Sequence, residues 1–186
     1  MFAMTLATLL VLAQLASSHA GAPPAAAVES PTTAGGLSWN LPKGWAGAPA
    51  SSMRVATYRT PAAAGDPEGG EVAVFYFGPG QGGGIDANVE RWFSQMTPEA
   101  GSRKPSRSQT KVGDILVTLC TAEGTYTGAM GMGGAPSAPK KGFTLEGAIA
   151  EGSGGAVFFK LTGPKKSVAK AKAAFDALVK SLKRAP

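Results

Sequence analysis

Alternating and continuous apolar runs predict a sheet along most of the chain. Residues 53–60 alternate as a half-buried strand does, whereas residues 71–78 are almost continuously apolar, which indicates a central strand covered on both faces. Gly113-Asp114 is typical of a tight hairpin turn between two later strands. We expect strands at residues 53–60, 71–78, 106–112, 115–127, 143–151 and 156–162, after a short strand near Leu37.

Two further segments carry apolar residues at helical spacing. The first runs from about Asp86, a suitable N-cap, to Met96, and Pro98 follows its end. The second begins at Pro164, which fits the first position of a helix because proline lacks the N–H that would be unpaired there. The order of elements predicts an α+β fold, with a mostly antiparallel sheet of about six to seven strands sandwiched by two helices.

Two sequence patterns resemble those of the PsbP-like superfamily. Residues 39–45 have the pattern W-x-x-P-x-G-W, and residues 158–164 read FFKLTGP before the terminal amphipathic helix. The resemblance covers about Leu37 to Leu182 and implies an α/β/α sandwich. It also implies a non-enzymatic protein, because known members mostly bind or stabilise protein partners.

The flanking composition predicts the organisation of the chain. Residues 1–20 contain no Lys, Arg, Asp or Glu, and an apolar run of secretory length precedes Ser18-His19-Ala20, so we expect an export signal. Residues 21–36 are rich in Ala, Pro and Gly and predict a flexible linker. We place a single PsbP-like domain at 37–183, with a mobile loop at 128–141. The predicted location is the periplasm or the exterior of the cell, without a transmembrane segment after signal cleavage.

Cysteine and histidine content restricts the possible chemistry. Cys120 is the only cysteine, so the chain has no Cys-x-x-Cys motif, and its place in an apolar strand indicates a buried, inert thiol. Cleavage after Ala20 would remove His19, the only histidine. A histidine-based triad or metal site is then excluded from the mature chain. We therefore predict that the protein is not an enzyme and has no catalytic residue, metal or cofactor.

The net charge of +6 is concentrated near the C-terminus. A basic face can attract nucleic acid or an acidic partner, but in an exported protein it is first a solvated helix face, and no nucleic-acid partner is expected. Asp176 is the one acidic residue among residues 160–186. Its basic residues are Lys160, Lys165, Lys166, Lys170, Lys172, Lys180, Lys183 and Arg184.

Residues 78–84 and the first helix form the candidate binding region. Glycines before a helix let backbone N–H groups approach an anion. The segment GPGQGGG, however, lacks the lysine of a phosphate-binding loop, and a plain connection remains the competing interpretation. The candidate binding residues are Gln81 in the loop and three polar residues of the helix, Asn88, Arg91 and Gln95.

These observations predict an exported, non-enzymatic protein that binds or stabilises a protein partner in the cell envelope or outside the cell. The alternative is a small-ligand or anion-binding protein that uses residues 78–84 and the first helix.

Overall fold

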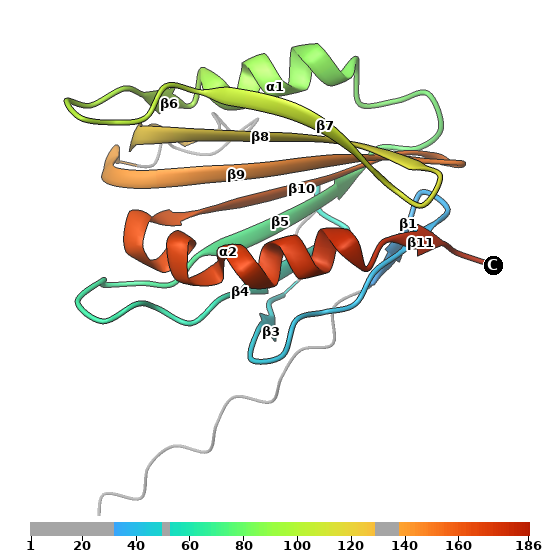
Figure 1. The fold of residues 1–186 in the computed structure, drawn as a ribbon, viewed down its shortest axis with the longest axis horizontal. Coiled ribbons are helices and arrows are strands. Elements are labelled where there is room, and N and C mark those ends of the chain that lie inside the picture. Colours follow the sequence, from blue (N-terminus) through green and yellow to red (C-terminus); the bar gives the residue numbers. More distant parts are fainter. Residues whose placement is uncertain (1–31, 50–52, 129–137) are drawn as a thin grey trace, which may run out of the picture.

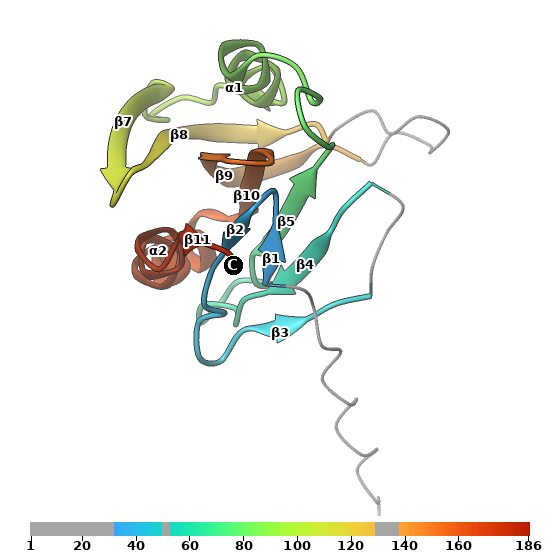
Figure 2. The ribbon, with the colours of Figure 1, turned by 90° about the vertical axis from the view of Figure 1, so that its right-hand side faces the viewer.

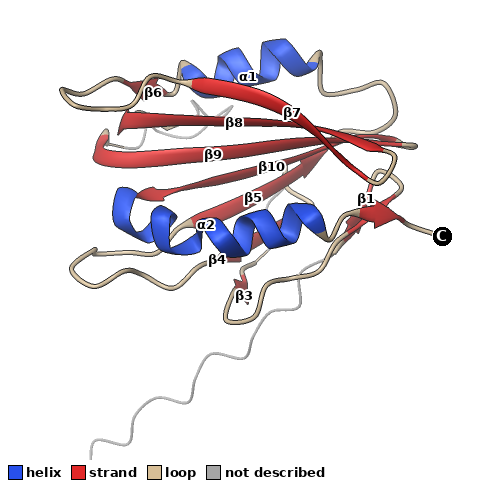
Figure 3. Ribbon diagram, in the orientation of Figure 1, coloured by secondary structure: helices blue, strands red, loops and turns tan. Residues whose placement is uncertain are grey.

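The computed structural model describes residues 32–49, 53–128 and 138–186. Two helices and eleven strands form this part of the chain (Figures 1 and 3). In chain order they are β1 (Thr33–Ala34), β2 (Leu37–Ser38), β3 (Ala46–Gly47), β4 (Ala56–Arg59), β5 (Glu71–Tyr76), α1 (Ile85–Phe93), β6 (Met96–Thr97), β7 (Ser106–Val112), β8 (Ile115–Tyr126), β9 (Lys140–Gly152), β10 (Gly155–Pro164), α2 (Lys165–Lys180) and β11 (Lys183–Arg184).

The strands form one large and one small sheet. The large sheet has eight strands in the order β3-β4-β5-β10-β9-β8-β6, with β7 also paired to β8. The small sheet joins β1, β2 and β11 near the C-terminus. Every pairing between these strands is antiparallel. The predicted α+β class, with a large antiparallel sheet and two helices, is confirmed.

Strand β10 shows how the sheet is covered on both faces. Successive side chains of a strand point to opposite faces. Val157, Phe159 and Leu161 belong to the core that packs against α2, whereas Phe158 belongs to the core that packs against α1. Lys160 shares the face of Phe158. Figure 2 shows the two helices on opposite sides of the sheet.

Each helix buries one apolar stripe against its own side of the sheet, as the spacing predicts. The stripe of α2 and the turn after it consists of Val168, Ala171, Phe175, Leu178, Val179 and Leu182. The stripe of α1 and the chain after it consists of Val89, Trp92 and Met96, which contact Cys120, Leu145, Ile149 and Phe158, among others.

Several predicted boundaries differ from the structure. Thr33 and Ala34 form β1, so the folded chain begins inside the predicted linker and before Leu37. Strand β9 begins at Lys140, so the end of the predicted loop 128–141 is paired to β8. The predicted signal, most of the linker and residues 129–137 lie outside the described residues.

The first helix also differs from its prediction at both ends. It begins one residue earlier and its N-cap is Gly84, whereas Asp86 lies in the first turn. It ends at Phe93 because Met96 has left the helix to pair with Tyr126 in the sheet. Within residues 32–49, 53–128 and 138–186, neither helix has the length and apolar content needed to cross a bilayer.

Candidate functional site

A buried lysine lies on the α1 face of the central strand β10. Lys160 is only 5% exposed although the strand around it is apolar. Its cross-strand neighbours are Ala73 on β5 and Gly147 on β9. These neighbours carry little or no side chain, so the long lysine side chain can extend over the sheet between them. Gly147 has no room for a larger residue, because a Cβ atom there would lie 2.4 Å from Trp92.

The ammonium group of Lys160 contacts neutral partners. Its Nζ donates to Oε1 of Gln95 at 3.0 Å and to the hydroxyl of Tyr126 at 3.4 Å. The same Nζ lies 5.7 Å from the centre of the Tyr126 ring, within range of a cation–π contact. Among the described residues, no carboxylate forms a salt bridge with Lys160. A buried cation without a paired anion is unusual, because burial is costly for a charge.

The charges around this lysine are mainly positive. Burial, followed by the positive charges of Arg54 and Arg91, lowers the pKa of Lys160 to about 8, whereas Glu71 acts in the opposite direction. Glu71 is itself engaged, since Arg54 approaches one of its oxygens at 2.7 Å and Arg59 the other at 2.9 Å. We call the group around the buried ammonium the Lys160 cluster: Arg54, Glu71, Arg91, Gln95, Tyr126 and Lys160.

The structure brings three of the four predicted binding residues to one region. Gln95 contacts Lys160 directly, and Arg91 donates to Oδ1 of Asn88. The amide nitrogen of Asn88 donates to the carbonyls of Gly82 and Gly84, at 2.8 and 2.9 Å, and so ties the glycine loop to the helix. Gln81 is exposed in a turn where its backbone N–H bonds Gly78, and it stays a prediction without a described contact to the other three.

Sequence reasoning missed the residue at the centre of this region. The sequence places Lys160 with the basic C-terminal residues, as part of a solvated face, whereas the structure buries it. A signal was present, because Lys160 interrupts the apolar run of FFKLTGP and falls two residues after Phe158, hence on the same buried face. The prediction for Cys120 is confirmed: the thiol is buried, and burial raises its pKa to about 12.

A strip of arginines and phenylalanines continues from the cluster along β4 and β5. Helix α1 lies over β8 and β9, towards the end of the sheet opposite β3 (Figure 2). Half-buried Phe75 on β5 and Phe77, which follows that strand, stack with their ring centres 6.1 Å apart. The guanidinium of Arg54 lies 5.8 Å from the centre of the Phe75 ring. We call Arg54, Arg59, Phe75 and Phe77 the arginine–phenylalanine strip.

A second buried charge lies on the opposite, α2 face. The Glu123 carboxylate accepts from Lys165 at 2.8 Å and forms a two-point contact with the Arg103 guanidinium, at 2.5 and 2.6 Å. The hydrogen bond from Lys165, followed by those from Arg103, lowers the pKa of Glu123 to about 2 against the opposing effect of burial. This carboxylate therefore fastens the start of α2 and the loop before β7 to strand β8.

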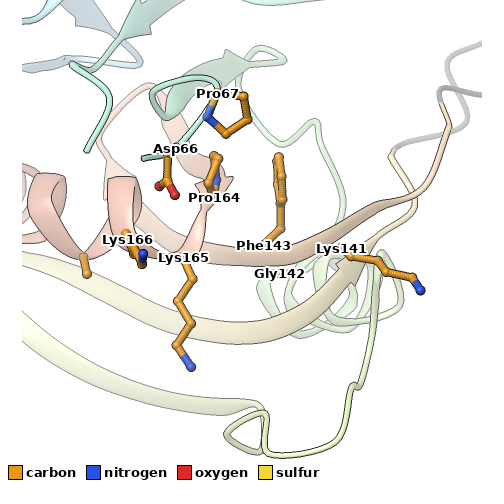
Figure 4. Close-up of a pocket in the computed structure, with 9 residues that line it drawn as sticks. Asp66, Pro67, Lys141, Gly142, Phe143, Pro164, Lys165 and Lys166 are labelled. Atoms are coloured by element: carbon orange, nitrogen blue, oxygen red, sulfur yellow. The ribbon is translucent and has the colours of Figure 1, made fainter. Parts of the chain in front are cut away.

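A recess of about 580 Å³ opens beside the start of α2. Pro67, Phe143 and Pro164 line it, and Figure 4 shows Lys165 pointing away from these rings. Asp66 accepts both the backbone N–H and the hydroxyl of Ser167, at 2.8 and 2.7 Å. Its carboxylate thus holds the loop after β4 against the first turn of α2. Within the described residues, no three His, Cys, Asp or Glu side chains group as a metal site requires.

The eight-stranded antiparallel sheet between two helices is the sandwich architecture that the sequence resemblance implied. Neither a family model nor a curated protein matches the sequence. The solved structures that are similar to this chain include two at 13% sequence identity. The solution structure of cyanobacterial PsbP (CyanoP) from Synechocystis sp. PCC 6803 is 13% identical, with a TM-score of 0.49 over 89% of this chain and 99% of that one. The crystal structure of LpqN from Mycobacterium tuberculosis, described as involved in cell envelope biogenesis, is 13% identical, with a TM-score of 0.50 over 81% of this chain and 83% of that one.

Proposed function

We propose that the chain is an exported, non-enzymatic protein of the cell envelope or the exterior, and that it binds a partner protein through an acidic segment. The arginine–phenylalanine strip is the observation that carries this proposal. The apolar run in residues 1–20 supports export, and the fold is shared with LpqN, a protein of envelope biogenesis.

The strip has the chemistry of a protein contact surface. Arginine and aromatic side chains are enriched at protein interfaces because they combine a large contact area with directional hydrogen bonds. Arg59 is 59% exposed on its side chain, and Met53, beside the strip in sequence, is 58% exposed. The only carboxylate within salt-bridge distance of Arg54 and Arg59 among the described residues is Glu71. The remaining positive charge favours an acidic partner segment.

Reversing the charge of exposed arginines tests the proposed partner surface. Arg59→Glu in the strip, combined with Arg91→Glu in the Lys160 cluster, changes two exposed side chains and leaves the apolar core intact. We expect crosslinking in the native envelope fraction to capture a specific protein with the wild type and to lose it with this variant. Binding of the purified partner should weaken at least tenfold, a change of about 1.4 kcal/mol. Added salt should weaken wild-type binding, since exposed charges are screened.

The matched control reverses two exposed charges on the opposite side of the molecule. Lys170→Glu combined with Lys180→Glu makes the same change in net charge on α2. This variant should keep the partner. Equal loss from both double variants would point to net charge alone, and retention by the Arg59/Arg91 variant would remove the strip as the partner surface.

A further inference from the structure

We infer that the Lys160 cluster binds a small oxyanion, the chemistry shared by a carboxylate and a phosphate, with the Lys160 ammonium as its central donor. This site is distinct from the glycine loop at residues 78–84. The inference does not depend on the proposed partner protein, because the ligand group is defined by side chains of this chain alone.

Hydrogen-bond capacity is the first argument. An ammonium group has three N–H donors. Among the described residues Lys160 has two acceptors, the Gln95 amide oxygen and the Tyr126 hydroxyl, and the contact to Tyr126 is long at 3.4 Å. The lysine therefore has capacity for a further acceptor. An oxyanion would supply both that acceptor and the missing negative charge, and hydrogen bonds between charged groups are the stronger ones.

The surrounding charges provide the second argument. Arg91 on α1 is exposed, and its described side-chain partner is the neutral amide of Asn88. Arg54 and Arg59 already share the single carboxylate of Glu71. The groups that face Lys160 from α1, β5, β8 and the segment before β4 thus sum to a positive field. This field would attract an anion towards the ammonium.

The pH dependence follows from the same groups. The titratable or charged groups around Lys160 are Arg54, Glu71, Arg91 and Tyr126. The pKa of the lysine itself is lowered to about 8, chiefly by burial. At neutral pH the ammonium is charged and binds the anion. Above the pKa it becomes a neutral amine and the anion is released. The site would therefore lose its ligand in mildly alkaline solution, before an ordinary lysine loses its proton.

The test is an NMR titration of the full chain with sulfate and, separately, acetate at constant ionic strength. Both ions keep a constant charge above neutral pH, and they represent phosphate and carboxylate ligands. The side-chain amide of Gln95 should shift and saturate, with a Kd of about 1 mM or tighter. The ion that binds more tightly identifies the ligand source. At about pH 9.5 the affinity should fall roughly 30-fold, in proportion to the charged fraction of Lys160.

Three variants make the result decisive. Lys160→Met should abolish the shift, Arg91→Gln should weaken binding several-fold, and Lys180→Met on the opposite helix should bind as the wild type does. Because Arg91 is exposed, its variant and the wild-type pH series remain informative even if Lys160→Met fails to fold. An absence of saturable shifts in the wild type, or equal binding by Lys160→Met, would overturn the inference. Arg91 is changed in both tests, so Arg59→Glu alone, which lies outside the Lys160 cluster, separates them: it should weaken partner capture and leave the saturable shift of Gln95 in place.

Discussion

Two buried charges, one on each face of the same sheet, have opposite surroundings. Glu123 on the α2 face has a side chain only 2% exposed and lies within 3 Å of two cations, Arg103 and Lys165. Lys160 on the α1 face is equally enclosed, but its hydrogen-bond partners are a neutral amide and a phenol. The first charge is neutralised within the chain, and the second is not.

This difference distinguishes a buried charge that stabilises the fold from a buried charge that is available for binding. A paired buried charge is strongly held, because removing its partners leaves an isolated ion away from water. The Glu123 contacts join three segments that are distant in sequence, which is a structural task. A buried lysine whose partners are neutral costs stability, because its charge is not compensated. Stability is often sacrificed where a protein needs a binding group, so Lys160 is the better candidate for function.

The largest expected effect tests the paired charge. Replacing both cations, Arg103→Gln with Lys165→Gln, leaves the buried Glu123 carboxylate without a cation, and the backbone N–H of residue 103, at 3.3 Å, stays as its donor. We expect a loss of about 3–5 kcal/mol in the free energy of unfolding, measured by urea denaturation. Adding Glu123→Gln removes the stranded charge and should recover most of that loss. If the triple variant were no more stable than the double, burial of an unpaired charge would not be the cause.

Acid titration gives the next effect in size. The pKa of Glu123 is about 2 in the folded chain and 4.5 in its unperturbed state. Between these values the unfolded chain binds more protons, so folding loses stability as the pH falls. The stabilisation is complete above pH 4.5 and is lost towards pH 2. Relative to Glu123→Gln, the wild type should lose about 3 kcal/mol over this window. A difference that stays constant with pH would contradict the assignment.

Hydrophobic spacing made the sheet and both helices predictable, because the stripes of α1 and α2 and the apolar strand β5 depend on local periodicity. The same spacing placed Arg91 and Gln95 on the polar side of the first helix, which made them candidate binding residues. The partners of the two buried charges were not predictable from spacing alone. Lys160 meets Gln95 and Glu123 meets Lys165 across 65 and 42 residues of sequence, and only the strand register places them together.

The smallest effect tests the unpaired charge and has the opposite sign. Lys160→Met keeps the length of the apolar stem and removes the ammonium. We expect it to raise the free energy of unfolding by about 1–2 kcal/mol at neutral pH, because a buried charge is replaced by an apolar group of similar volume.

The pKa of Lys160 is about 8 in the folded chain and 10.5 in its unperturbed state, so between these values the unfolded chain binds more protons. The wild type should therefore gain stability relative to the variant as the pH rises through this window. Denaturation of both proteins across that range checks the sign. If Lys160→Met were destabilising at neutral pH, the ammonium would hold the fold together as Glu123 does, and the contrast between the two faces would fail.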